Sequence, residues 1–365
     1  MSQFIQFHIL TSYPPGNLNR DDLGAPKTAM LGGKRRLRIS SQCLKRTWRT
    51  SEVFQERFAG QLGQRTKRMG TELFEQLCQQ GVSEGNAKEW ATKMAEAFGK
   101  LKAEDKKEKT PDKDAKKKRA VIEHETMTHY SPEEQQALQK LVHTLVSTGR
   151  APTADELKLL TRSRTGVDIA LFGRMLAATP EFNCDAAAQV AHAITVHETA
   201  VESDYFSAVD DLNRGDEDRG SGHIGEQEFG AGVFYLYLCI NHTQLLKNLG
   251  GHQALADRAA KALLEAALTV APSGKQNSFG TRAYASYLRI EKGSRQPRAL
   301  TAAFLMPTRA GEKGMMANAI NALETTCTQL DQCYGPVAEA AYTMNTLEKV
   351  GTLRDALAFV EGGQA

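Results

Sequence analysis

The residues with the clearest chemical potential are cations concentrated near the start of the chain. Residues 20–49 hold nine Arg and Lys against two Asp, which gives this segment a charge of +7. Guanidinium and ammonium groups neutralise phosphates, and neighbouring hydroxyl and amide side chains add hydrogen bonds to phosphate oxygens. The pair Gly32-Gly33 would let a ligand approach the backbone closely. A solvated basic face is the simpler alternative, but the density of cations and the flanking glycines favour phosphate binding.

The remaining chain has the opposite charge balance. Residues 101–119 carry nine basic and five acidic groups (+4), so the net charge of +3 leaves −8 for the other 316 residues. Polyanion binding predicts such polarisation, whereas a surface charged only for solubility would intersperse its signs. The stretch 103–119 is itself of low complexity, and we interpret it as a solvated loop.

The composition and length limit the classes of protein to which this chain can belong. The chain has 365 residues, of which 41% are hydrophobic and 24% charged, as in an ordinary globular protein. At about 150 residues per domain, the length predicts two or three domains, or one core with large insertions. No apolar run approaches the roughly 20 residues of a membrane helix, and the N-terminus lacks a secretory signal pattern. The six cysteines are too sparse for a disulfide scaffold, so a cytoplasmic location is expected.

No motif predicts a cofactor or a resident metal. Gly220–Gly225 matches the dinucleotide pattern, but that site needs a strand before it and a helix after it. Gly33-Lys34 lacks the flanking residues of a phosphate loop, and no His, Cys and carboxylate set has zinc spacing. Asp21-Asp22 and Asp210-Asp211 could bind a divalent ion, although loop capping or salt bridges is the favoured interpretation.

The basic segment is expected to fold as a strand followed by a helix. Within 35–39, Leu37 and Ile39 would share one face of the strand, and Arg36 and Arg38 the other. A helix would follow, with Ser40 or Ser41 as its N-cap, Leu44 and Trp48 docking on a core, and a polar row of Gln42, Arg46 and Arg49.

The rest of the chain alternates strands and helices, as is typical of an α+β fold with a ferredoxin-like core. Residues 56–182 have a helical pattern with capping boxes at Ser131-x-x-Glu134 and Thr153-x-x-Glu156. We expect a long loop at 11–33, a protruding loop or hairpin at 202–228, strands at 4–10, 191–200, 229–241, 282–291 and 299–306, and helices at 68–101, 251–269, 315–333 and 353–361.

Four parts of the sequence stand out together: NLNRDD (17–22), GGKRRLRISSQCLKR (32–46), GVDIALFGRM (166–175), and 191–212 with 220–241. Together they resemble the CasC family, the backbone subunits of the type I-E CRISPR surveillance complex Cascade. The resemblance implies an RRM-like (ferredoxin-like) palm, an inserted helical fingers domain and a β-hairpin thumb. The expected boundaries are 1–55 for the first part of the palm, 56–182 for the fingers, 183–200 for a palm strand, 201–228 for the thumb and 229–365 for the second part of the palm.

The resemblance also implies a non-catalytic subunit that oligomerises head-to-tail along the spacer of a CRISPR RNA. It would grip the sugar-phosphate backbone without sequence specificity, displace bases periodically with its thumb, and leave the others free to pair with target DNA in antiviral defence. Its partners would be the CRISPR RNA, target DNA, copies of itself, and the large, small, cap and repeat-processing subunits. The carried-over RNA contacts are Arg20, Lys27, Lys34, Ser40, Gln42, Lys45, Arg46, Arg49 and the wedge Met175; the thumb contacts are Tyr205, Phe206 and Ile224; and Lys116, Lys117 and Lys118 could face DNA.

Cys43 departs from the family pattern, which commonly has a small hydroxyl residue at this position. Two other functions stay open. The chain could be an RNA-guided endoribonuclease that uses Asp21 or Asp22, or a generic nucleic-acid-binding protein that stays monomeric on long RNA.

Overall fold

The computed structural model describes residues 2–103, 121–161, 165–176, 179–208 and 223–361. The chain forms two compact units. We call them the sheet unit (Met1–Arg57, Ala188–Thr243 and Gln253–Ala365) and the helical unit (Phe58–Ala187 and Gln244–His252). The palm, fingers and thumb boundaries expected from the sequence stay predictions.

The sheet unit is built on a nine-stranded sheet within the described residues, and its strand pairs are antiparallel. Along the main path the order is β11 (Ala340–Asn345), β10 (Ala285–Gly293), β1 (Phe4–Gly16), β9 (His223–Asn241), β7 (Ala193–Thr195), β3 (Lys34–Ile39) and β2 (Thr28–Leu31). Two further strands, β6 (Ala188–Val190) and β8 (Glu202–Ala208), pair with β9 outside this path.

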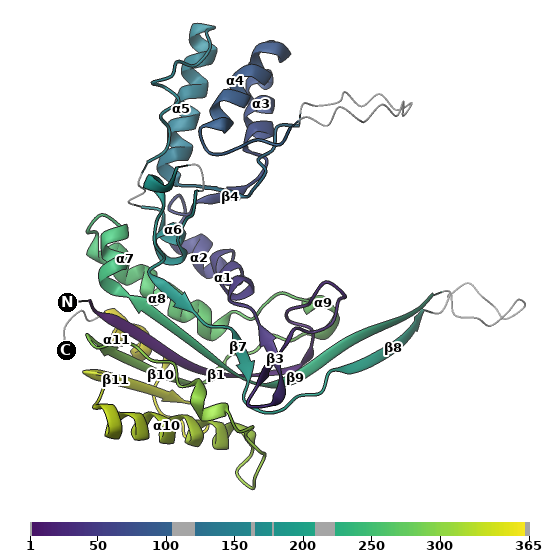
Figure 1. Cartoon of the computed structure of the whole chain (residues 1–365), viewed down its shortest axis with the longest axis vertical. Coiled ribbons are helices and arrows are strands. Elements are labelled where there is room, and N and C mark those ends of the chain that lie inside the picture. The colour runs from purple at the N-terminus through teal and green to yellow at the C-terminus, as the bar shows by residue number, and fades with distance from the viewer. Residues whose placement is uncertain (1, 104–120, 162–164, 177–178, 209–222, 362–365) are drawn as a thin grey trace, which may run out of the picture. The chain divides into compact units, whose positions relative to one another are not determined.

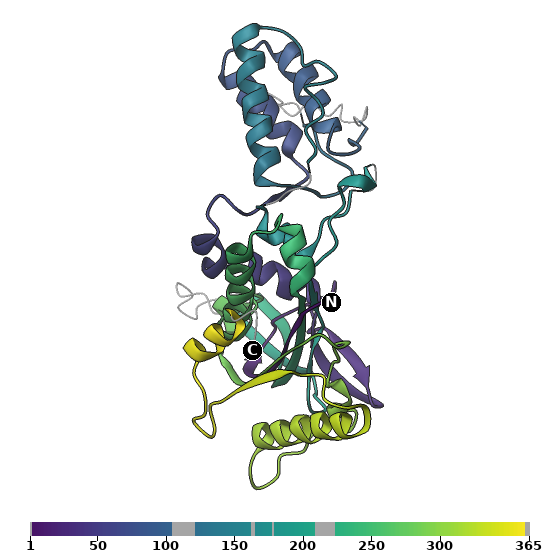
Figure 2. The ribbon, with the colours of Figure 1, turned by 90° about the vertical axis from the view of Figure 1, so that its left-hand side faces the viewer.

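Both faces of the sheet are covered, which explains why β1 is buried continuously from Ile5 to Leu10 instead of alternating. Helix α8 (Gln253–Thr269) and helix α10 (Met315–Tyr334) lie on opposite faces (Figures 1 and 2). On the α10 face, Tyr235 and Tyr287 form a buried cluster with residues of α10 and of the 3-10 turn η2 (Thr301–Phe304). The remaining helices of the sheet unit are α1 (Ser41–Arg49), α2 (Glu52–Arg57), α9 (Gln276–Phe279) and α11 (Leu353–Glu361).

The helical unit has its own core. Buried side chains such as Leu77, Trp90 and Leu145 pack together from three helices. The elements of this unit are α3 (Met69–Gln79), α4 (Glu84–Glu96), α5 (Pro132–Thr148), α6 (Val167–Phe172), the ribbon β4 (Gln64–Thr66) with β5 (Thr128–Tyr130), and η1 (Pro180–Phe182). Helix α7 (His242–Asn248) begins in the sheet unit and continues into the helical unit. No described helix is long and apolar enough to cross a membrane.

The predicted α+β class, the helices at 251–269, 315–333 and 353–361, and the capping box of Ser131 and Glu134 are confirmed. Several expectations are wrong. The helix expected at 68–101 is two helices, α3 and α4, with residues 80–83 between them, and the strand expected at 191–200 is limited to β7. Residues 299–306 form the turn η2 and not a strand, because Phe304 is buried under α10 while Leu305 and Met306 remain exposed. Strand β1 continues to Gly16 and β2 lies at 28–31, within the expected loop 11–33. Thr153 and Glu156 exchange the capping-box hydrogen bonds, but the chain there makes only a turn.

Candidate nucleic-acid interface

Helix α1 displays the polar row expected from the sequence. Ser40 is its N-cap, and the Ser40 hydroxyl accepts a hydrogen bond from the backbone N–H of Cys43 (3.3 Å). Leu44 and Trp48 are buried, as predicted. This docking leaves four polar side chains on the outer side of the helix, Gln42 and Arg46 exposed, Lys45 and Arg49 half-buried. Burial lowers the pKa of the Lys45 ammonium, so a bound anion would restore the stability of its charged form.

The loop before β2 is tied to the start of α1 through Asn19. The Asn19 side-chain oxygen accepts a hydrogen bond from the Ser40 N–H (2.8 Å), and its carbonyl accepts one from the Lys27 N–H (2.8 Å). Arg20, which is exposed, forms a backbone bridge with Pro26. These bonds bring the backbones of three predicted RNA contacts, at positions 20, 27 and 40, into one connected substructure.

The β2–β3 turn requires glycine. Gly32 has a φ of +59°, and a Cβ on it would lie 1.7 Å from the Leu305 carbonyl oxygen. Lys34, directly after the turn, is exposed and forms an ion pair with Glu198 (3.1 Å). Glu198 is itself exposed, so it competes only weakly with a phosphate for the Lys34 ammonium, because surface ion pairs contribute about 0–1 kcal/mol.

Arg36 does not behave as the sequence predicts. It lies on the strand face opposite Leu37, as expected from alternation, but that face is covered here and Arg36 is fully buried. Its guanidinium donates hydrogen bonds to the carbonyl oxygens of Thr195 (3.1 Å) and Phe304 (2.8 Å). One of the nine cations in this segment is therefore structural and is not available to a phosphate.

Arg38 and His192 form a further basic pair, outside the RNA contacts predicted from the sequence. The Arg38 guanidinium lies 3.0 Å from the His192 Nδ1. Partial burial, followed by the positive charges of Arg38 and Lys27, lowers the pKa of the His192 ring. His192 was not among the residues singled out from the sequence. The run of cations on the paired strand β3 was the signal that could have placed it here.

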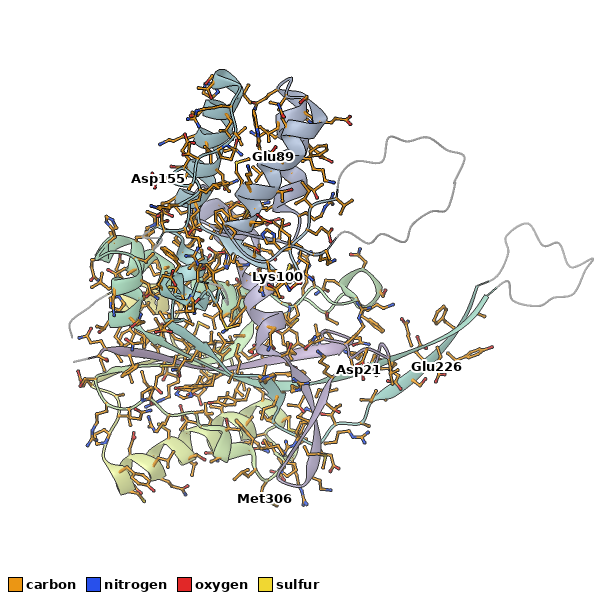
Figure 3. All side chains as sticks on the ribbon, turned by 45° about the horizontal axis from the view of Figure 1, so that its top comes forward. Asp21, Glu89, Lys100, Asp155, Glu226 and Met306 are labelled. Atoms are coloured by element: carbon orange, nitrogen blue, oxygen red, sulfur yellow. The ribbon has the colours of Figure 1, made fainter. Side chains whose placement is uncertain are left out.

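The Asp21 carboxylate has structural partners. One Asp21 carboxylate oxygen accepts hydrogen bonds from the N–H groups of Leu23 (3.0 Å) and Ala25 (2.9 Å), which is the loop capping favoured from the sequence. Figure 3 shows Asp21 in this loop and Glu226 on the neighbouring hairpin. Within the described residues, no group of three or more His, Cys, Asp or Glu is arranged to hold a metal ion.

Strand β8 and the start of β9 form a two-stranded hairpin that extends beyond the sheet (Figure 1). Tyr205 is 67% exposed, and Phe206 is 40% exposed with its ring against Gly225, where a Cβ would lie 2.4 Å from the ring. The backbone of Ile224 pairs with Ser207, but the Ile224 side chain and residues 209–222 lie outside what the structure describes.

Met175 belongs to the helical unit and is 82% exposed. Single exposed apolar side chains are common on protein surfaces, so this exposure leaves Met175 accessible to a ligand but does not by itself assign a role to it. Lys116, Lys117 and Lys118, the possible DNA contacts, lie outside the described residues.

The chain belongs to the CT1975-like protein family, which matches residues 5–359. A chain in a solved structure described as "CRISPR RNA-guided surveillance complex, pre-nicking" is 29% identical, with a TM-score of 0.81 over 98% of this chain and 100% of that one. A second, in a "CRISPR RNA-guided surveillance complex", is 24% identical with a TM-score of 0.70 over 98% and 99%, and shows the fold alone. No curated protein sequence matches significantly.

These findings confirm the resemblance drawn from the sequence at the level of family and fold. The chain is related to the backbone subunits of CRISPR surveillance complexes. Its antiparallel sheet corresponds to an RRM-like palm, combined with a helical insertion and a β-hairpin.

Proposed function

We propose that this protein is a non-catalytic backbone subunit of a type I-E surveillance complex, which grips a CRISPR RNA along its sugar-phosphate backbone. The observation that carries the proposal is the cluster of cations around α1, β2 and β3 in the sheet unit. We call seven of these cations the basic surface: Arg20, Lys27, Lys34, Arg38, Lys45, Arg46 and Arg49.

The composition of this surface suits a guide of arbitrary sequence. Arg, Lys, Ser and Gln side chains and free N–H groups of a helix start are typical phosphate ligands, and phosphate contacts carry no sequence information. The Ser40 hydroxyl caps α1 through a lone pair, so its proton remains available to a phosphate oxygen. Base pairing with target DNA then supplies the specificity, and the protein needs only to hold the backbone.

Base displacement would be performed by apolar side chains. Met175, Tyr205 and Phe206 are all exposed, uncharged and able to contact any base, and Ile224 belongs to the same proposal. Unstacking one nucleotide costs a few kcal/mol, which the phosphate contacts would offset. The proposed partners are the guide RNA, target DNA, further copies of this chain in a head-to-tail oligomer, and the large, small, cap and repeat-processing subunits. Lys116, Lys117 and Lys118 would face the DNA.

The test is the paired substitution Lys45→Ala plus Arg49→Ala. Two charge-assisted contacts of about 1.5 kcal/mol each correspond to an affinity loss of about 100-fold. The loss should be equal for unrelated guide sequences, and the slope of log affinity against log salt should flatten by about 1.4, or 0.7 per single-strand phosphate contact. Arg354→Ala plus Lys349→Ala, which removes two exposed cations of the sheet unit near α11, is the matched control and should bind as the unmodified protein does.

A loss confined to some guide sequences would contradict backbone recognition. The endoribonuclease alternative is tested with the same assembly, complementary RNA and Mg²⁺. Cleavage that disappears in Asp22→Ala would overturn the non-catalytic proposal. A chain that remains monomeric on long RNA would favour a generic nucleic-acid-binding protein.

A further inference from the structure

The chain around Met175 alternates sharply between inside and outside. Arg174 is 5% exposed, Met175 is 82% exposed and Leu176 is 6% exposed. Such alternation over three residues is that of a strand, and the backbone bonds agree with it. The N–H and carbonyl of Arg174 both pair with those of Cys184, at 2.9 Å each.

Residues on both sides of Met175 fix this short bridge. Gly173 has a φ of +81°, and a Cβ there would lie 3.0 Å from the Cys184 carbonyl oxygen, so the entry to the bridge requires glycine. After Met175, the Leu176 N–H donates to the Asn183 side-chain oxygen (2.6 Å). The exposed methionine therefore stands on a segment whose backbone is bonded on both sides.

The Arg174 side chain anchors this segment to the rest of the helical unit. Its Nη1 donates to the Glu134 carboxylate (2.6 Å), and its Nη2 donates to the carbonyl oxygens of Thr161 (2.9 Å) and Phe182 (3.0 Å). Both charged side chains of the pair are almost fully buried. A planar guanidinium can satisfy three acceptors on separate segments at once, which a lysine ammonium on a flexible stem cannot do with the same geometry.

Glu134 is held just as firmly. Its carboxylate also accepts the N–H groups of Ser131 (2.8 Å), in the capping box of α5, and of Thr161 (2.8 Å). The pair thus joins the start of α5 to three other segments of the same unit. A buried ion pair is a costly way to gain stability, but it fixes one arrangement, because breaking it leaves a buried charge without its partner.

We infer that Arg174 is a positioning residue, and that its buried pair with Glu134 holds Met175 rigidly outward against a nucleobase. The inference rests on the proposed function, in which Met175 is the wedge. A flexible thioether displaces a stacked base only if its own backbone does not yield. The anchor supplies that rigidity without touching the RNA.

The experiment measures base displacement separately from affinity. The full chain is assembled on a guide-length RNA that carries 2-aminopurine at successive positions, and its fluorescence rises where a base is unstacked. Arg174→Lys keeps the charge opposite Glu134 but loses the planar guanidinium. Asn183→Ala removes the exposed side chain whose oxygen accepts the hydrogen bond from the Leu176 N–H. Both variants should lose most of the periodic signal, while RNA affinity changes by less than about twofold.

A double variant shows whether Arg174 acts through Met175. Met175→Ala should lose the periodic signal, and Arg174→Lys combined with Met175→Ala should lose no more than Met175→Ala alone. Three outcomes would overturn the positioning role. They are losses of signal that multiply in the double variant, a wild-type signal in Arg174→Lys or Asn183→Ala, and an RNA affinity that falls in parallel with the signal.

Two controls separate the possible failures. Arg150→Lys alters an exposed two-bonded pair with Glu156 in the same unit and should keep the wild-type signal. An equal loss in this control would show general loosening of the unit and would overturn the inference. A wild-type signal in Met175→Ala would instead show that Met175 is not the wedge. That result would contradict the base displacement assigned to Met175 in the proposed function.

Discussion

The basic surface and the β8–β9 hairpin belong to the same sheet unit, yet their chemistry is opposite. The basic surface displays seven cations among the residues described, in a segment with two aspartates. The described hairpin, 202–208 and 223–228, has no Lys or Arg and carries Glu202, Asp204, Glu226 and Glu228. A hairpin of this charge repels phosphates, so in the proposed function its contact with the RNA would come from aromatic faces.

The difference in charge between the basic surface and the hairpin should appear in the salt dependence of RNA binding. Contacts between cations and phosphates release counterions and make binding salt-dependent, whereas stacking of a base on an aromatic ring does not. Substitutions in the two regions should therefore differ in kind, even where they weaken binding by the same amount. The salt slope distinguishes them directly.

Among the substitutions that distinguish the two regions, Tyr205→Ala plus Phe206→Ala should cause the largest loss of RNA affinity. Loss of stacking at about 1–3 kcal/mol per base predicts an affinity loss of at least about tenfold, with an unchanged salt slope. Binding titrations from low to high salt check this. Tyr205→Phe keeps the ring and should bind normally, and a flattened slope in the double variant would show that the hairpin contacts phosphates after all.

A smaller effect is expected from reversing the charge of the hairpin. Asp204→Lys plus Glu226→Lys places two cations on neighbouring strands, because Asp204 pairs with Gln227 and Glu226 with Tyr205. If the RNA passes this hairpin, affinity at low salt should rise by about fivefold, and the slope should steepen by up to about 1.4. The neutral variant Asp204→Asn plus Glu226→Gln should show a weaker change in the same direction; no change in either would place the RNA away from the hairpin.

Elements of the sheet unit differ in how far the sequence alone defines them. For α1, local rules were almost enough. Helical periodicity places Leu44 and Trp48 on one buried side, which is confirmed, whereas capping preference left Ser40 or Ser41 as the N-cap and the structure selects Ser40. The position of Phe304 in a turn was hidden, because a short apolar run does not distinguish a strand from a buried turn.

Arg36 shows why the functional residues could be predicted only in part. Alternation places Arg36 and Arg38 on one face of β3, but it does not say that the chain near Phe304 covers the inner end of that face. A contact with a residue 268 positions away buries Arg36, and a contact with a residue 154 positions away places Arg38 against His192. The family resemblance supplied Met175, whose exposure no local rule predicts.

The smallest predicted effect comes from His192 and tests whether the basic surface extends as far as Arg38. In the free protein the pKa of His192 lies below its ordinary value, so its ring is neutral near pH 7. A phosphate beside it favours the protonated ring, so its pKa is higher in the complex. Binding then takes up a proton, and affinity rises as the pH falls through the bound pKa, levelling off below the free pKa. We expect affinity to change by about threefold across this range, which is the size of a weak exposed charge contact.

His192→Gln should remove this dependence in titrations between pH 5.5 and 8 at constant ionic strength. His143→Gln, at an exposed position of α5, is the matched control and should keep the pH dependence. An unchanged pH dependence in His192→Gln would show that the Arg38 and His192 pair does not contact the phosphates.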